Sequence, residues 1–279
     1  MRIKRVAIQG IEASFHDVAA RKYFGDHVQI VPCNSFRLSC EKLANGDADY
    51  CVMAIENSIA GSILTNYNII SDFRLRIIGE LYMQIELHLM GLNGIRIDEV
   101  EQIHSHTMAI RQCEDFLLGF PDVKVLALSD TAECARNVSE QKLDHVGVIA
   151  GEACARQYHL SIIVRNIETH KKNYTRFIVL SDKSIPVKGA NKASISFQLD
   201  NSPRSLQKVV DVFGDHSINM TKIQSVPIIG RPSEYTFLMD LEWKDFSKYE
   251  RAMAKVMKNV FHLSLLGEYR KGKFVTSKP

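Results

Sequence analysis

Short apolar runs that alternate with helical segments are the feature that most constrains how this chain folds. Apolar runs at Val6–Ile8, Val28–Val31 and Tyr50–Ile55 are separated by stretches with amphipathic helical spacing, near residues 15–23 and 35–43. Strands that are joined through helices usually pair in parallel, so this order predicts an α/β lobe.

A second set of alternating elements follows an extended stretch, 75–92, in which apolar side chains occupy every other position. Strands are predicted near 101–104, 123–128 and 146–149, and helices near 108–118, 131–138 and 152–158. Ligands of open α/β sheets bind at the carboxyl ends of strands, and clefts between lobes are common ligand sites. We therefore expect a two-lobed domain over residues 1–181, with the second lobe at about 80–165 and a cleft between the lobes.

A polar linker over residues 181–192, with one proline and one glycine, predicts a domain boundary. Beyond it, strands near 194–199, 219–226, 235–241 and 263–269 are interleaved with helices near 203–213 and 246–260. The β-α-β-β-α-β order is that of the ferredoxin-like fold, which we expect over residues 193–273. Pro203 is predicted at the first helical position, which proline favours.

Composition restricts the classes of function. The formal net charge of +3 over 279 residues, with no long basic stripe, argues against a nucleic-acid partner. No apolar run approaches the roughly 20 residues of a membrane span. None of the six cysteines forms a Cys-x-x-Cys pair, which favours reduced, buried thiols and a cytoplasmic location.

Motifs that bind common cofactors are missing from the sequence. There is no glycine-rich phosphate loop after a strand, and His104 and His106 have no evident third ligand nearby. We therefore expect no cofactor and no metal.

Polar residues follow five of the predicted strands, at Gly10–Ser14, Glu56–Ser58, Ser105–His106, Thr131 and Gly151. In an α/β lobe such positions meet at one edge, where helix N-termini present N–H groups to anions. Each residue taken singly could be only a helix cap. Taken together, the five positions favour a cleft that binds carboxylates.

Several motifs follow one another along the sequence in an order and spacing typical of one enzyme family. They are Gly10…Ser14-Phe15-His16, Ile55-Glu56-Asn57-Ser58-Ile59-Ala60-Gly61-Ser62, Ser105-His106…Gln112-Cys113 and Asn173-Tyr174-Thr175-Arg176-Phe177. The chain resembles the prephenate dehydratases over nearly its whole length, and its C-terminal module resembles the ACT regulatory domain that those enzymes carry.

The resemblance implies a catalytic domain with two lobes, like those of periplasmic binding proteins. It also implies decarboxylation and dehydration of prephenate to phenylpyruvate in phenylalanine biosynthesis, without a cofactor, because the ring accepts the electrons. The implied catalytic residues are Thr175, Glu56 and Asn57, with Thr175 as donor to the departing hydroxyl. The implied substrate-binding residues are Ser14, Ser58, Ser105, His106, Gln112, Thr131, Asn173, Arg176 and Phe177. Strand alternation places Arg176 on the opposite face from Thr175, so a structural ion pair is an equal alternative for it.

The regulatory motifs depart from the family more than the catalytic ones do. Where the family has Gly-Ala-Leu and Glu-Ser-Arg-Pro for binding phenylalanine, this chain has Arg204-Ser205-Leu206 and Gln224-Ser225-Val226-Pro227. The implied regulatory positions are Asn201, Leu206, Gln224, Ser225 and Pro227. Because a glycine allows close approach of a ligand and Arg204 crowds that space, we expect the L-phenylalanine effector site to be lost or rebuilt.

Three alternative functions would use lobes of this kind. An arogenate dehydratase performs the same elimination on a substrate with an amino group, and the sequence scarcely separates the two. A non-catalytic amino-acid-sensing protein has no need of the intact Asn173–Phe177 run. A phosphoribosyltransferase would need a pyrophosphate loop. We expect a homodimer or homotetramer, and no helical chorismate mutase segment before the first strand.

Overall fold

The computed structural model describes residues 3–228 and 230–278. The chain divides into two compact units. The first contains residues up to Ile69, Leu81–Ile178 and the segment from Lys273, and the second contains Ile70–Glu80 and Val179–Gly272.

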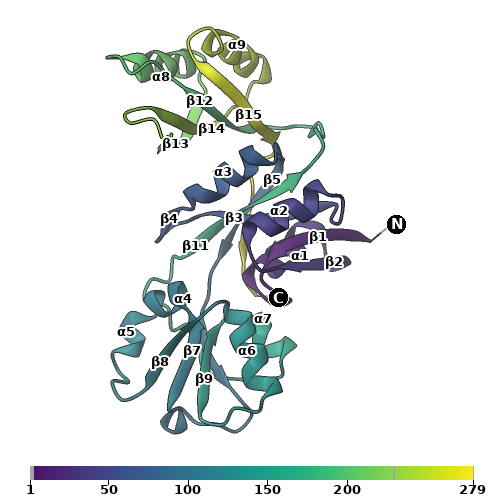
Figure 1. The fold of residues 1–279 in the computed structure, drawn as a ribbon, viewed down its shortest axis with the longest axis vertical. Helices are drawn as coiled ribbons and strands as arrows, with labels where there is room; N and C mark the ends of the chain where they lie inside the picture. Colours follow the sequence, from purple (N-terminus) through teal and green to yellow (C-terminus); the bar gives the residue numbers. More distant parts are fainter. Residues whose placement is uncertain (1–2, 229, 279) are drawn as a thin grey trace. The chain divides into compact units, whose positions relative to one another are not determined.

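The first lobe is built on a sheet with the strand order β16-β5-β11-β3-β1-β2, to which β4 adds beside β3 (Figure 1). Its strands are β1 Lys4–Gln9, β2 Val28–Cys33, β3 Tyr50–Asn57, β4 Gly61–Ser62, β5 Arg76–Gln84, β11 Tyr174–Ser181 and β16 Phe274–Thr276. Its helices are α1 Phe15–Phe24, α2 Phe36–Ala44 and α3 Leu64–Asp72. β1 pairs in parallel with both β2 and β3, as the alternation of strands and helices predicts.

The second lobe has a sheet with the order β10-β6-β9-β7-β8. Its strands are β6 His88–Gly91, β7 Gln102–His106, β8 Lys124–Leu128, β9 Val146–Ala150 and β10 Ser161–Val164. Its helices are α4 Thr107–Gln112, α5 Glu114–Leu117, α6 Thr131–Glu140 and α7 Glu152–Gln157, with the 3₁₀ turn η1 at Ile97–Glu99. β7 pairs in parallel with β8 and β9, so the predicted second α/β lobe is confirmed.

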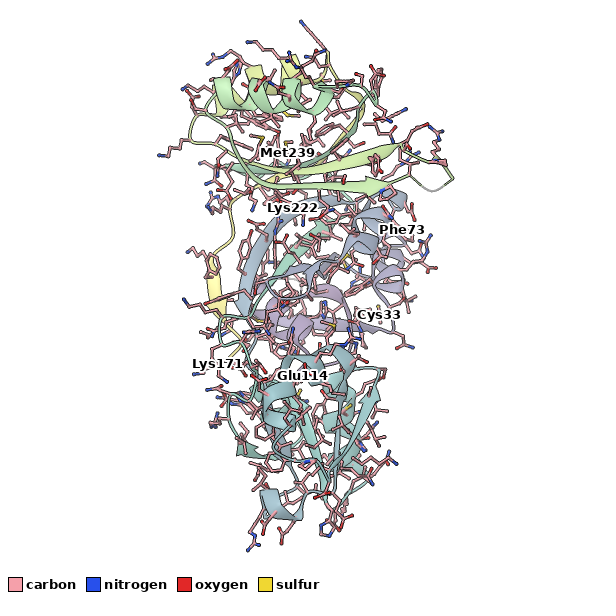
Figure 2. All side chains as sticks on the ribbon, turned by 90° about the vertical axis from the view of Figure 1, so that its left-hand side faces the viewer. Cys33, Phe73, Glu114, Lys171, Lys222 and Met239 are labelled. Atoms are coloured by element: carbon pink, nitrogen blue, oxygen red, sulfur yellow. The ribbon has the colours of Figure 1, made fainter. Side chains whose placement is uncertain are left out.

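The second unit contains an antiparallel sheet with the order β13-β14-β12-β15. Its strands are β12 Lys192–Gln198, β13 Asn219–Pro227, β14 Tyr235–Glu242 and β15 Phe261–Tyr269, and its helices are α8 Ser205–Asp215 and α9 Phe246–Val256. Apolar side chains of sheet and helices, Met239 among them, form one core between these layers (Figure 2). The predicted ferredoxin-like arrangement is confirmed.

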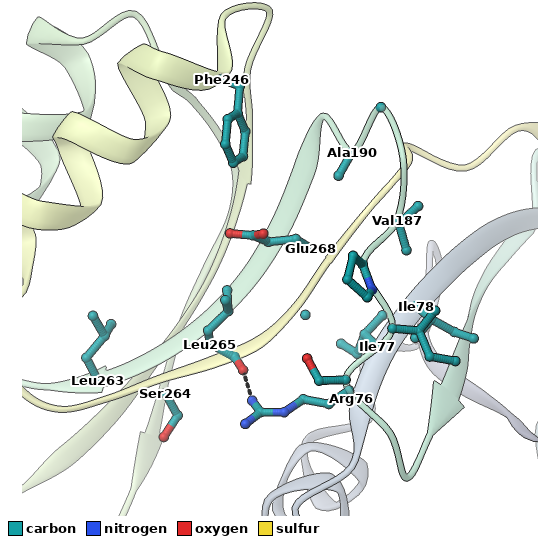
Figure 3. A pocket seen from close by; sticks show the side chains of 15 residues that line it. Arg76, Ile77, Ile78, Val187, Ala190, Phe246, Leu263, Ser264, Leu265 and Glu268 are labelled. Carbon is teal, nitrogen blue, oxygen red and sulfur yellow. Dashed lines mark hydrogen bonds between the residues drawn. The ribbon is translucent and has the colours of Figure 1, made fainter.

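The second unit also holds a hollow of about 740 Å³, between residues 184–190, residues 76–78 and β15 (Figure 3). The guanidinium of Arg76 donates to the carbonyl of Leu265 within it. A side chain at Gly267 would meet the backbone of Ile77, so this close approach requires glycine. Nearby, the ammonium of Lys192 is buried and lies 3.0 Å from Glu80 Oε1 and 3.4 Å from Glu242 Oε1.

Several predicted boundaries are wrong. β7 extends to His106, so Ser105 and His106 lie inside the strand and not after it. The helix expected over 108–118 is two short helices that break at Cys113. Pro203 lies outside α8, because the helix is preceded by Arg204 in the left-handed conformation (φ 66°).

The sequence did not predict α3, β4, β10, β16 or the 3₁₀ turn η1. β4 and β16 have two and three residues, too few for a periodic pattern to be visible. Among the described helices, none has the length and apolar character needed to cross a bilayer. All six cysteines are buried and unpaired, as predicted.

Candidate active site

Thr175 lies near the start of β11, between β5 and β3 in the sheet. Strand alternation places Thr175 and Phe177 on one face and Tyr174 and Arg176 on the other. Phe177 is buried, and its ring meets the ring of His16 edge to face at 5.1 Å, so it packs in the core of the lobe. Thr175 keeps 9% of its surface exposed at the edge of this packed region.

The side-chain amide of Asn57 orients Thr175. Its Nδ2 donates to Thr175 Oγ1 at 3.0 Å and to Asn173 Oδ1 at 2.8 Å. Its Oδ1 accepts from the backbone N–H groups of Ile59 and Ala60, both at 2.9 Å, so the amide cannot turn around without losing these bonds. Because Thr175 Oγ1 accepts from Asn57, the hydroxyl proton of Thr175 is left to donate elsewhere.

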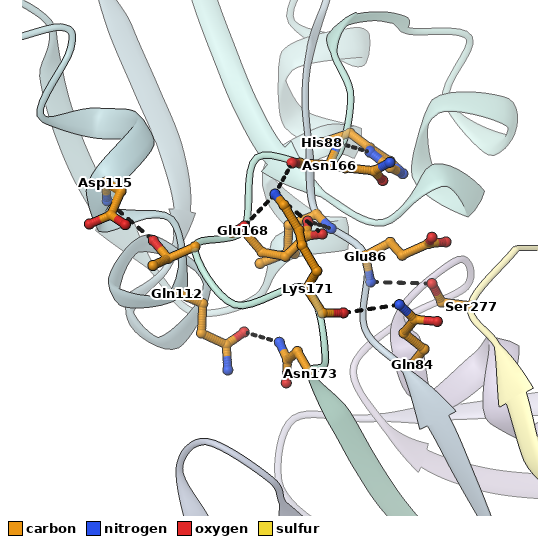
Figure 4. Close-up of polar contacts among 12 residues, drawn as sticks. Gln84, Glu86, His88, Gln112, Asp115, Asn166, Glu168, Lys171, Asn173 and Ser277 are labelled. Carbon is orange, nitrogen blue, oxygen red and sulfur yellow. Dashed lines mark hydrogen bonds and ion pairs between the residues drawn. The ribbon is translucent and has the colours of Figure 1, made fainter.

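The side-chain hydrogen bonds among Thr175, Asn57 and Asn173, called the amide chain below, continue into the second lobe. Asn173 is fully buried, and its Nδ2 donates to Gln112 Oε1 at 3.0 Å, at the end of α4 (Figure 4). Gln112, Asn173, Asn57 and Thr175 therefore form one connected set of hydrogen bonds, which rigidifies the groups that it joins. All four are residues that the sequence analysis selected.

Ser58 joins the turn after β3 to the start of β11. Its hydroxyl accepts from Tyr174 N at 2.9 Å and donates to the carbonyl of Lys172 at 3.3 Å. A hollow of about 520 Å³ lies beside it, lined also by Ile59 and by residues 169–172. With His170, Lys171 and Lys172 in its lining, this hollow is basic in character.

Two helix N-termini meet where the sequence predicts a carboxylate site. Ser14 is buried and caps α1 by accepting from Asp17 N at 3.3 Å. Thr131 opens α6, which is capped by the carboxylate of Asp130. A Cβ at Gly10 would lie 3.1 Å from Asp130 Oδ2 and 3.3 Å from Ser14 Oγ, so Gly10 lies close to the starts of both α1 and α6.

Asp130 is a residue that the sequence analysis missed. Its Oδ1 accepts from Ala132 N at 2.8 Å and Glu133 N at 3.1 Å. Burial nevertheless raises the pKa of Asp130, because desolvation outweighs these two hydrogen bonds. An aspartate directly before the predicted helix at 131–138 is a common N-cap signal and could have drawn attention to it.

Other predicted site residues are engaged in the fold. Ser105 is fully buried, and its hydroxyl donates to Ile149 O at 2.6 Å, which joins β7 to β9. His106 caps α4, since its Nδ1 accepts from Met108 N at 3.2 Å. Glu56 lies beside Asn57 in β3, where alternation directs it to the opposite face. Arg176 is buried, with its guanidinium 5.9 Å from the ring centroid of Tyr82.

Two histidines, His16 and His88, each accept a hydrogen bond from a backbone N–H group. His16 Nε2 accepts from Ala54 N at 3.3 Å, and burial lowers the pKa of His16 to about 4. His88 Nδ1 accepts from Asn166 N at 2.9 Å, and burial likewise lowers the pKa of His88. Within residues 3–228 and 230–278, no cluster of three metal-ligating side chains is present.

The regulatory positions lie in the loop before α8, at its start and on β13. Asn201 is exposed, and Leu206 packs at the edge of the core. On β13, Gln224 Nε2 donates to Ser225 O at 3.0 Å, while Ser225 and Pro227 are exposed.

Comparison with protein families matches residues 6–185 to the family described as Prephenate dehydratase. The chain belongs to the prephenate dehydratase family. Its N-terminal two lobes are the matched part, and they contain Thr175 together with the whole amide chain.

Curated relatives agree with this assignment. A bifunctional chorismate mutase/prephenate dehydratase of Aquifex aeolicus is 34% identical over 269 residues, which cover 96% of this chain and 74% of the relative. Arogenate dehydratase 2 of Petunia hybrida is 36% identical over 227 residues, covering 80% of this chain. This chain spans 57% of the length of that plant relative.

Two solved structures share the fold over 96% of this chain. A prephenate dehydratase from Arthrobacter aurescens, solved in complex with L-Phe, aligns with a TM-score of 0.83 and 22% identity over 96% of this chain and 90% of that one. A protein described as GqqA, a novel type of quorum quenching acylase, aligns with a TM-score of 0.86 and 25% identity over 96% and 98% of the two chains.

Proposed function

We propose that this chain is a prephenate dehydratase that forms phenylpyruvate for phenylalanine biosynthesis. The observation that carries the proposal is the bond from Asn57 Nδ2 to Thr175 Oγ1, inside the part of the chain that matches the family. In this reaction the bond from the ring to its carboxylate breaks and releases CO2. The electron pair enters the ring, and the 4-hydroxyl departs and is protonated to water.

Thr175 is the proposed donor to the departing hydroxyl. Asn57 occupies the acceptor side of its hydroxyl, so the proton of Thr175 is available to the leaving oxygen. A donor that is already oriented stabilises developing negative charge without reorganisation, and removing one such donor typically slows turnover by about a hundredfold or more. Asn173 and Gln112 serve by holding Asn57 and the strand in place.

The carboxylates of the substrate are proposed to bind at the N-termini of α1 and α6. Ser14 and Thr131 lie at the starts of these helices, where the positive end of the helix dipole attracts anions. Asp130 lies beside them, and burial raises its pKa above the ordinary value of an aspartate. The basic hollow beside Ser58 offers a second place for negative charge.

Turnover of two substrates tests the proposal. The purified chain is incubated with prephenate and, in parallel, with arogenate, because some of the similar plant relatives are named arogenate dehydratases. Prephenate turnover is followed by the ultraviolet absorbance of phenylpyruvate, and arogenate turnover by formation of phenylalanine. A higher kcat/KM for prephenate is the expected result. Binding of either compound without product would instead identify a non-catalytic sensing protein.

The C-terminal domain is proposed to be a regulatory ACT domain over residues 193–273, following a catalytic domain over 1–181. A structural relative is described in complex with L-Phe, yet this chain has Arg204 and Gln224 within the corresponding motifs. We expect no inhibition of turnover by L-phenylalanine at micromolar concentration. Calorimetric titration with L-phenylalanine tests this, and a tight, saturable isotherm would contradict it. A cytoplasmic homodimer or homotetramer completes the proposal.

A further inference from the structure

The segment that follows β15 in the sequence supplies the edge strand of the first lobe's sheet. β16 pairs in parallel with β5, in the register Phe274↔Tyr82 to Thr276↔Gln84. The pairing is extended at both ends, because Tyr82 N donates to Lys273 O at 3.0 Å and Glu86 N donates to Ser277 Oγ at 3.4 Å. Residues 273–277 are called the C-terminal strap below.

Residues 82–86, which contact the strap, also form hydrogen bonds with residues 171–173, just before Thr175 in the sequence. Ile85 N donates to Asn173 O at 2.8 Å, and Gln84 Nε2 donates to Lys171 O at 3.0 Å (Figure 4). Residues 82–86 therefore lie between the strap and residues 171–173, in agreement with the strand order β16-β5-β11. A shift of this stretch would displace Asn173, whose side chain contacts Asn57 and Gln112.

Phe274 adds an aromatic contact between the strap and β11. Its ring stacks on Tyr82 at 4.9 Å and meets Tyr174 edge to face at 5.5 Å. Tyr174 directly precedes Thr175, and offset or edge-to-face rings prefer defined geometries. Phe274 itself is 67% exposed, so burial of apolar surface gives little reason for its position.

We propose that the C-terminal strap positions the catalytic strand, with Phe274 as the positioning residue. Phe274 acts through Tyr82 and Tyr174 and fixes the placement of Thr175 from the opposite face of the sheet. The expected effect on kcat rests on the proposed dehydratase function. The expected effect on the position of β11 rests on the contacts alone.

Kinetics of Phe274 variants test the role. We expect Phe274→Ala to lower kcat for prephenate by about tenfold, with KM changed less than about twofold, because a misplaced donor slows chemistry more than binding. Phe274→Tyr retains the ring and should restore kcat. The matched control is Phe261→Ala, which removes a ring that is 53% exposed on β15. It should leave both constants unchanged.

Hydrogen–deuterium exchange provides a second measurement that does not depend on turnover. The amides of Ile85 and Tyr174, which bond to Asn173 O and Ser58 Oγ, should exchange at least about threefold faster in Phe274→Ala than in wild type. If wild type fails to turn over prephenate, the proposed function fails, while the exchange result still decides the role of the strap.

Three outcomes would overturn the inference: wild-type exchange in Phe274→Ala, a kcat within about twofold of wild type, or a loss of kcat that Phe274→Tyr does not restore. If Phe274→Ala does not fold, Ser277→Ala replaces it. That change removes only the acceptor of Glu86 N and should produce a smaller change in the same direction. Wild-type kcat and exchange in Ser277→Ala would then count against the strap.

Discussion

The amide of Asn57 has two tasks that two substitutions separate. Its Oδ1 accepts from Ile59 N and Ala60 N and so shapes the turn after β3. Its Nδ2 donates to Asn173 and Thr175 and so orients the proposed donor. Asn57→Ala removes both sets of bonds, whereas Asn57→Asp keeps an acceptor oxygen for the turn and removes both donors.

The expected magnitudes follow from the number of bonds. A protein hydrogen bond contributes a net free energy of about 1 kcal/mol, so losing all four bonds lowers the unfolding free energy of Asn57→Ala by about 4 kcal/mol. Asn57→Asp keeps the two turn bonds and loses only the two donated by Nδ2, so its unfolding free energy should fall by about 2 kcal/mol. Loss of the two donors weakens transition-state stabilisation by about 2 kcal/mol, or roughly thirtyfold in kcat.

The aspartate variant should be the slower enzyme despite being the more stable protein. A carboxylate at position 57 accepts the hydroxyl proton of Thr175 and turns it away from the substrate. Urea denaturation measures stability, and phenylpyruvate absorbance measures kcat. Asn93→Asp is the matched control, because Asn93 Oδ1 accepts from Ser161 at 2.6 Å and keeps that role as aspartate. A wild-type kcat in Asn57→Asp would refute the reasoning.

Three further predictions concern the backbone, an imidazole and the thiols. Gly10→Ala should cost at least about 1 kcal/mol in urea denaturation, because Gly10 has φ 96° and a Cβ there crowds Asp130; unchanged stability would contradict this. His16 has a folded pKa of about 4, below the unfolded value of about 6.5. Its contribution to stability is therefore complete above pH 6.5 and is lost as pH falls toward 4, about 3 kcal/mol in all. Denaturation curves across this range should show that loss, and it should be smaller in His16→Gln. All six thiols are buried, so a thiol reagent should react slowly with the native protein and rapidly with all six thiols in urea. Rapid reaction of the thiols in the native protein would contradict this prediction.

The sequence was sufficient to predict the order of the lobes and the ferredoxin-like domain, because their central strands are strongly apolar. Val6, Ala7 and Ile8 are completely buried, and such runs are visible without tertiary information. The short β16 could not be predicted, since it becomes a strand only by pairing with β5, which lies about 190 residues earlier.

Residue types at the site were predicted more successfully than their contacts. Asn57 and Thr175 were both selected, but they are 118 residues apart in sequence, and only the fold brings them to 3.0 Å. The hydroxyl of Ser105 was expected to face a substrate and instead donates to Ile149 O. A serine motif does not reveal which acceptor the folded chain provides, and the buried environment of Asp130 is equally invisible in the sequence.

Turnover of prephenate by Thr175→Val is the most direct test of the central claim. Valine retains the branched shape of threonine and its preference for strands, and it removes the hydroxyl. We predict a folded protein whose kcat is lower by about a hundredfold or more, with Thr175→Ser retaining most of the activity. A kcat for Thr175→Val close to that of wild type would contradict the assignment of Thr175 as the donor to the departing hydroxyl.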